Sequence, residues 1–196
     1  SSYLRLPIYR NAITSLEVVG DYAVGGTSAN PGLSPFLFAV SLSNRKLEIV
    51  YPLEKAVAGQ RAIQSGFGRG ADGTLYAGTM PDQPGESGHL IAVRVKAGAI
   101  EVNDLGVPVK GEGVFALACD PKAGALYGIS HPSGKFFAFR LNGGTEVYEQ
   151  TAPSRRTLGF LHGYAIEAAD VLSRRLAIDG SGRVYGSMPV NKLFRF

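Results

Sequence analysis

Three isolated histidines are the side chains in this sequence best suited to acid–base chemistry. His131 lies in the segment SHPSG, while His162 and His89 stand apart from any other histidine or cysteine. A histidine can exchange a proton near neutral pH, hydrogen-bond to a ligand or bind a metal ion. His131 is the first candidate for a catalytic acid or base, His162 is the second, and His89 ranks below both. The alternative at each position is a solvated or capping histidine.

Three arginines could bind an anionic ligand. Arg61, Arg156 and Arg175 each precede or begin a strand-like run. The planar guanidinium fork matches the geometry of carboxylates, sulfates and phosphates. We therefore predict that these arginines bind a ligand, with ordinary surface salt bridging as the alternative for any one of them.

Other signatures of chemistry are missing from the sequence. No His/Cys spacing matches a metal site, no nucleophile elbow or calcium loop occurs, and nothing identifies a cofactor. The run GFGRGADG is followed by a strand-like segment and not by the helix that a phosphate-binding loop needs. The lone Cys119, in VFALAC, is interpreted as a buried strand thiol, because a nucleophile would want a partnered histidine.

The elements that must position these residues come from an internal repeat. A tyrosine close to a glycine, then a polar gap and an apolar run, recurs four times at intervals of about 50 residues. The tyrosines are Tyr22, Tyr76, Tyr127 and Tyr185, and the runs are FLFAVSL, HLIAVRV, KFFAFRL and KLFRF.

Each repeat contains apolar runs separated by turn residues, which predicts successive antiparallel strands. The predicted strands are 14–19, 22–25, 36–42 and 46–51 in the first unit; 62–67, 74–79, 89–95 and 99–105 in the second; 114–119, 125–130, 135–141 and 145–150 in the third; and 175–179, 183–188 and 192–196 in the fourth. Between Leu158 and Arg175 lies an irregular insertion. Within it Ile166, Ala169 and Leu172 recur at helical spacing and predict one short helix.

Four short strands per repeat predict an all-β fold, a β-propeller with four blades. The blades span approximately 11–55, 56–110, 111–153 and 154–196 of a single domain, 1–196. Strand 3–8 is expected to complete the last blade as its outer strand and so to remove an exposed sheet edge. The alternative is a fragment of a ring of roughly six to eight blades, which would assemble with further blades or another chain.

The repeats resemble known propeller families. VVGDYAVGG followed by FLFAV is similar to a kelch repeat with its paired glycines, although kelch repeats usually carry an outer-strand tryptophan and this chain has none. DPKAGALYG and DGSGRVYG followed by LFRF look like quinoprotein-like or polysaccharide-lyase-like blades. These motifs imply the fold and little about activity.

In a blade of four up-and-down strands, the turns between strands one and two and between strands three and four lie on one face of the disc. The loops between strands two and three and the connections between blades lie on the other face. Asp72, Asp120 and Asp179 fall together on the face of tight turns, where each reads as a turn former. The longer loops and the connections between blades share the opposite face, where function concentrates on loop-decorated scaffolds. The repeated tyrosines are expected to pack between blades.

Composition and charge leave two classes of function open. The net charge of +4 is spread over scattered basic pairs, which argues against a nucleic-acid stripe, and no apolar run is long enough to span a membrane. We expect a soluble protein, periplasmic or secreted in preference to cytoplasmic. The first hypothesis is a binding propeller that engages a protein or an anionic glycan through its looped face. The second is a lyase or hydrolase acting on an anionic polysaccharide at the propeller axis, with His131 or His162 as acid or base.

Overall fold

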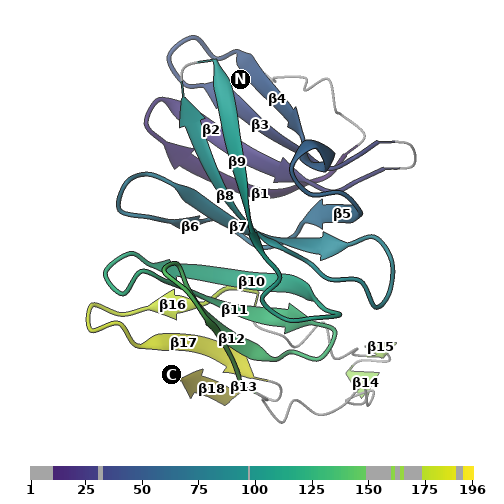
Figure 1. The fold of residues 1–196 in the computed structure, drawn as a ribbon, viewed down its shortest axis with the longest axis vertical. Helices are drawn as coiled ribbons and strands as arrows, with labels where there is room; N and C mark the ends of the chain where they lie inside the picture. Colours follow the sequence, from purple (N-terminus) through teal and green to yellow (C-terminus); the bar gives the residue numbers. More distant parts are fainter. Residues whose placement is uncertain are drawn as a thin grey trace.

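The structure is a computed structural model that describes residues 11–30, 33–96, 98–148, 160–161, 164–165, 174–188 and 192–196. In this part of the chain the regular structure is β-strand, apart from one 3-10 turn, η1 (Leu53–Lys55). Four antiparallel sheets of three to five strands follow one another along the sequence, and Figure 1 shows them stacked in chain order. The all-β prediction is confirmed.

The four sheets are named by their order. The first sheet contains β1 (Ile13–Val19), β2 (Tyr22–Thr27), β3 (Phe36–Ser41) and β4 (Leu47–Pro52). The second sheet contains β5 (Gln60–Ile63), β6 (Gly68–Arg69), β7 (Leu75–Pro81), β8 (Leu90–Lys96) and β9 (Ala99–Gly106). The third sheet contains β10 (Gly113–Asp120), β11 (Ala125–His131), β12 (Phe136–Arg140) and β13 (Thr145–Tyr148). The fourth sheet contains β16 (Ala177–Ile178), β17 (Val184–Met188) and β18 (Lys192–Arg195).

Two predicted strands differ from the structure. The strand predicted at 62–67 is broken into β5 and β6, because the N–H groups of Gln64 and Ser65 both donate to the Gly78 carbonyl and the chain leaves the ladder there. In the fourth sheet, the strand predicted at 175–179 shrinks to β16, because the Asp179 side chain accepts hydrogen bonds from the following turn. The predicted strand 3–8 and the helix through Ile166, Ala169 and Leu172 lie outside the described residues. The described part of the insertion forms two short paired strands, β14 (Phe160–Leu161) and β15 (Tyr164–Ala165).

Apolar clusters between neighbouring sheets hold the stack together. One joins the first and second sheets through residues such as Leu37 and Ile91. A second joins the second and third sheets, with Leu90 against the side of Phe137, and a third joins the third and fourth sheets around Phe136 and Val184. Burial of apolar area is the main stabilising contribution, at about 25 cal/mol per Å².

Three of the four repeated tyrosines lie in these clusters, as predicted. Tyr22 packs between the first and second sheets, Tyr76 between the second and third, and Tyr127 between the third and fourth. Each tyrosine therefore faces the sheet that follows its own. The motif marks the packing of one sheet on the next.

A β-bulge interrupts the first strand of each of the first three sheets near its start. One residue on each strand lacks a partner in the ladder: Thr14 on β1, Arg61 on β5 and Phe115 on β10. A bulge leaves one extra residue unpaired and redirects its side chain. These three positions lie beside the ends of β2, β7 and β11, where the longer loops begin.

Candidate functional site

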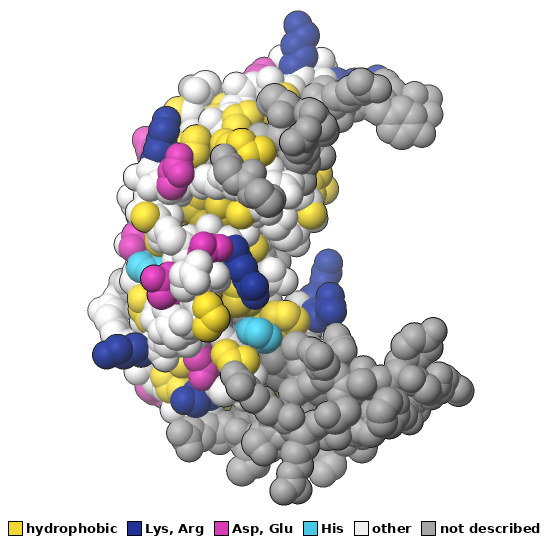
Figure 2. Space-filling view, turned by 90° about the vertical axis from the view of Figure 1, so that its right-hand side faces the viewer, with side chains coloured by type: hydrophobic (Ala, Val, Ile, Leu, Met, Phe, Trp, Pro, Cys, Tyr) yellow, Lys and Arg dark blue, Asp and Glu magenta, His cyan; other side chains and the backbone are white. Residues whose placement is uncertain are grey.

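The first strands of the four sheets, with the segments beside them, surround a hollow of about 410 Å³, called here the inner hollow. Figure 2 shows that the molecule is hollowed along one side, with basic side chains and a histidine at the edge of the hollow. The lining residues that bear on its chemistry are Leu16, Glu17, Arg69, Cys119, Arg174 and Arg175. Because every sheet contributes, the stacking of the sheets creates this site.

Arginines dominate the charge of the inner hollow. Arg69, Arg174 and Arg175 line it, and Glu17 is the carboxylate among the lining residues. The Nη1 atom of Arg69 donates to the Val18 carbonyl oxygen at 3.3 Å, which ties the arginine of the second sheet to β1 of the first. Three guanidinium groups against one carboxylate favour an anionic ligand.

An aromatic stack lies next to Arg174, one of the residues that line the inner hollow. The ring centroids of Phe115 and His131 are 5.9 Å apart with an interplanar angle of 26°, and the Arg174 guanidinium carbon lies 6.0 Å from the Phe115 centroid. The bulge at Phe115 directs its ring to this position. The structure thus brings His131 and an arginine to the same phenylalanine. The predicted loop start at His131 is wrong by one residue, because His131 is the last residue of β11, opposite Gly113.

A largely buried carboxylate braces the loop that follows His131. The Glu112 side chain is 11% exposed, and its Oε2 accepts hydrogen bonds from Ser130 Oγ at 2.5 Å and Ser133 Oγ at 2.7 Å. Lys135 Nζ lies 3.9 Å from Oε1. These contacts fix both sides of His131 and hold it in position against Phe115.

A second hollow, the lateral hollow, of about 670 Å³, lies between the first and second sheets on the looped face. Its polar lining includes Arg61, Gln64, Glu54 and Asp82. Arg61 reaches it from the bulge on β5. The predicted arginines Arg61 and Arg175 therefore line different hollows, and Arg156 lies outside the described residues, as does His162.

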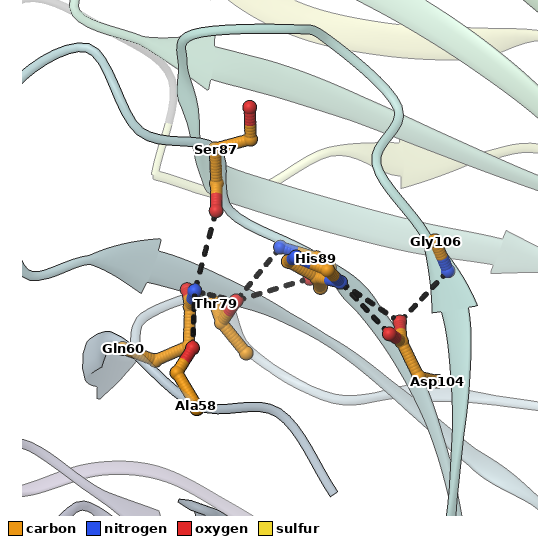
Figure 3. A network of polar contacts seen from close by, with 7 residues as sticks. All are labelled: Ala58, Gln60, Thr79, Ser87, His89, Asp104 and Gly106. Carbon is orange, nitrogen blue, oxygen red and sulfur yellow. Dashed lines mark hydrogen bonds and ion pairs between the residues drawn. The ribbon is translucent and has the colours of Figure 1, made fainter.

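His89 is part of a structural network away from the inner hollow. Its Nδ1 lies 2.9 Å from Asp104 Oδ1, which also accepts from the Gly106 N–H (Figure 3). The His89 N–H donates to the buried Thr79 hydroxyl, and this hydroxyl donates to Gln60 Oε1. The network fastens the start of β8 to β9 through Asp104, and to β7 and β5 through Thr79 and Gln60. These contacts account for His89 without a ligand.

The aspartates of the tight turns stabilise their own turns, as predicted. Hydrogen bonds from the N–H and hydroxyl of Thr74 hold the pKa of Asp72 below its usual value. The Ser181 hydroxyl and the N–H groups of Ser181 and Arg183 likewise lower the pKa of Asp179. Asp120 accepts from two N–H groups of its turn.

Cys119 lies at the wall of the inner hollow and is half-buried, more exposed than the buried thiol expected from its apolar run. Burial raises the pKa of its thiol to about 11, with the Asp120 charge adding to the effect. A neutral thiol is a poor nucleophile. Cys119 therefore contributes packing and not nucleophilic chemistry at neutral pH.

The described residues offer neither a cluster of metal ligands nor a membrane-spanning helix. Across the described ranges no three His, Cys, Asp or Glu side chains gather closely enough to hold a metal ion. The described residues also contain no helix of the length and apolarity needed to cross a bilayer.

The sequence signal was uneven for these residues. Arg175 and His131 were found because they stand beside predicted strands. Three residues left no sign in the sequence: Phe115, Arg69 and Arg174. Phe115 resembles any other apolar strand residue, and Arg69 lies within the glycine run GFGRGADG, which does not qualify as a phosphate-binding loop. A bulge leaves no mark in a single sequence, so the half-buried position of Phe115 outside the ladder was not predictable.

No protein-family model matches the sequence, and no curated protein matches it. Solved structures do match. A catalytically inactive virginiamycin B lyase from Staphylococcus aureus, solved with quinupristin, has a TM-score of 0.59 at 12% identity, over 98% of this chain and 58% of that one. The WD40 repeats of RRP9 give 0.56 at 14% identity, over 95% and 51%. A Bacteroides caccae protein of unknown function gives 0.55 at 10% identity, over 95% and 61%.

These likenesses show the fold, which is that of a β-propeller, with the stacked antiparallel sheets as its blades. The chain spans between 51% and 61% of the length of these solved chains. At such low identities the function of the matched proteins does not carry over.

Proposed function

We propose that this protein is a binding β-propeller that holds an anionic glycan in the inner hollow. The observation that carries the proposal is the set of three arginines, Arg69, Arg174 and Arg175, around a hollow to which every sheet contributes. Arginine forks bind the carboxylate of a uronic acid in a bidentate manner. The bulged Phe115 offers an aromatic surface next to Arg174, where the apolar face of a sugar ring can lie.

Calorimetry with a defined oligogalacturonate tests this function. Replacing Arg174 by alanine is expected to weaken binding about tenfold, equivalent to about 1.4 kcal/mol. Raised salt should weaken binding by the wild-type protein more than by the variant, since charge attraction is screened. Arg94→Ala is the matched control, because Arg94 pairs with Asp72 at 2.9 Å among the tight turns.

Three results would count against the glycan proposal. These are the absence of binding, equal binding of a neutral oligosaccharide, and equal weakening by the Arg94 and Arg174 substitutions. Tighter binding of a polyglutamate peptide than of the oligogalacturonate would instead favour an acidic protein segment as the ligand.

A catalytic role is the second candidate, and the position of His131 favours it. The His131 ring centroid and the Arg174 guanidinium carbon lie 5.9 Å and 6.0 Å from the centroid of the Phe115 ring, so a base and a carboxylate-binding group share one aromatic neighbour. In a β-elimination on a uronate, the base removes the C5 proton and the bond from C4 to the leaving oxygen breaks, with Arg174 neutralising the enolate-like charge.

The unsaturated product gives this second candidate a direct assay. Ultraviolet absorbance from the new double bond should appear with wild-type protein and polygalacturonate and vanish in His131→Ala. His162→Ala tests the other predicted histidine. Binding without any double-bond formation leaves the binding function and removes the lyase.

A further inference from the structure

The first sheet has an apolar face that no other described sheet covers. Residues directly opposite each other on neighbouring strands point to the same side of a sheet. One row on this face is Val18, Ala23 and Val40, and the next is Leu16, Gly25, Phe38 and Val50. The opposite side of the sheet, which carries Val24 and Ile49, packs on the second sheet.

The part of this face that lies on β1 is too apolar for a surface in contact with water. Leu16 is 61% exposed and Val18 is 46% exposed, whereas Phe38 in the same row is 2% exposed; neither row contains a charged residue. A sheet that is apolar on both sides is typical of one that is covered on both sides. Exposed apolar patches of this kind mark interaction surfaces.

The repeat indicates what kind of surface belongs there. The residue after each repeated tyrosine faces the preceding sheet. Ala77 lies in the cluster shared with the first sheet, and Gly128 lies under Phe137, which packs toward the second sheet. Ala23 occupies this position in the first sheet. The uncovered face of the first sheet therefore carries the same kind of side chains that, in the second and third sheets, pack against the tyrosine-bearing face of the preceding sheet.

Among the described sheets, one other face of the required kind is left uncovered by a neighbouring sheet, and it lies on the fourth sheet. Val184 packs against the third sheet, so its neighbour Tyr185 points the other way, together with Arg195 and Ala177 opposite it in the ladder. Leu193 lies on the same side and is 80% exposed. The first and fourth sheets stand at opposite ends of the stack (Figure 1).

We propose that two copies of this chain associate head to tail, the first sheet of each copy packing on the fourth sheet of the other, and close one propeller ring. The contact repeats the packing already present three times between consecutive sheets. The two copies together supply eight sheets, within the range of roughly four to eight blades for propellers. The chain covers 58% and 51% of two solved propellers, so a ring of their size needs more sheets than this chain supplies alone.

Closure would also complete the inner hollow, because first strands from both copies would then surround it. A head-to-tail contact that closes after two copies gives a dimer, whereas one that does not close gives open filaments. The proposal does not depend on the ligand, since it rests on the faces of the sheets alone.

Light scattering after size-exclusion chromatography tests the association. The wild-type chain should elute as a particle of twice its mass of 20.7 kDa. Val18→Glu and Leu193→Glu should each give a monomer, because each places a charge on one of the two contact faces. Val107→Glu is the matched control: Val107 is 39% exposed, lies between β9 and β10, and should leave the dimer intact.

Mixing the two variants gives the sharpest result. The Val18→Glu chain keeps a sound fourth sheet and the Leu193→Glu chain a sound first sheet, so their mixture should regain dimers through one intact contact. Misfolded variants could not do this. A monomeric wild type, a dimeric Leu193→Glu variant or a mixture that stays monomeric would overturn the proposal. The second of these would mean that first sheets pair with each other.

Discussion

Phe137 lies across Gly128 on the neighbouring strand so closely that a Cβ atom added to the glycine would stand 2.2 Å from the ring. The same relation recurs between Gly25 and Phe38 and between Gly186 and Phe194. The glycine that accompanies the repeated tyrosine therefore serves a packing purpose. Because glycine has no Cβ, the aromatic ring of the neighbouring strand can lie flat over it, on the side of the sheet that faces the preceding sheet.

Gly128→Ala should accordingly destabilise the protein by about 1–3 kcal/mol, the usual cost of overpacking a filled core. Urea unfolding followed by tyrosine fluorescence measures this loss. Adding Phe137→Leu to the variant should restore part of it, because the smaller side chain makes room. Gly180→Ala is the control, since an added Cβ there meets nothing within 4 Å; equal losses in both variants would refute the packing explanation.

Glu112→Gln should lower the free energy of unfolding by about 1–3 kcal/mol, because the largely buried carboxylate accepts bonds from Ser130 and Ser133 that an amide cannot fully replace. The same substitution should shift the His131 ring resonances in an NMR spectrum. Glu101→Gln is the control, since Glu101 is an exposed partner of Lys96. Unchanged His131 resonances would show that Glu112 does not hold that loop.

Cys119 should react with a disulfide reagent slowly at neutral pH. With a thiol pKa of about 11, the reactive thiolate is about one part in a thousand at pH 8. The rate should rise close to tenfold per pH unit until the pH approaches 11, and unfolding in urea should speed the reaction at pH 8. A rate that levels off near pH 8.5 would mean an unshifted thiol.

Asp179→Asn should reduce the melting temperature at pH 7 and have a shrinking effect in acid. The folded state lowers the pKa of Asp179, so its stabilising contribution is present above the unfolded pKa of about 4 and is lost as the pH falls through the folded value. Melting curves of both proteins between pH 7 and pH 3 should converge toward the acid end. A constant difference across that range would assign the loss to something other than this ionisation.

Periodicity was enough to predict the arrangement of strands. Apart from the run at 62–67, each apolar run between turn signals in the first three units became a strand within a few residues of its predicted bounds, because strand pairing repeats the same local pattern in each sheet. The failure at 62–67 has a local cause, since Ser65 turns its hydroxyl toward the N–H of Gly78 and interrupts the ladder. No pattern of apolar residues encodes such a bond.

The candidate site was harder to predict, because it is assembled from residues far apart in the chain. Arg69 and Arg174 meet around one hollow only after the second and fourth sheets have stacked on either side of the third. Single-residue chemistry identified His131 but could not pair it with Phe115. Contacts across sheets require the register of the stack, and a single sequence does not contain that information.

Most strand residues must both pair in the ladder and supply a useful side chain. At the bulges on the first strands, the extra residue is free of the requirement to pair. Thr14, Arg61 and Phe115 occupy similar places in three sheets, yet one ties neighbouring sheets through a 2.6 Å bond to the Ile63 carbonyl, one carries a charge and one carries an aromatic ring. A residue outside the ladder can be exchanged without disturbing the pairing of its strand. The same scaffold could therefore acquire a new ligand preference through substitutions at these three positions alone, which makes them the natural sites for randomisation in a selection experiment.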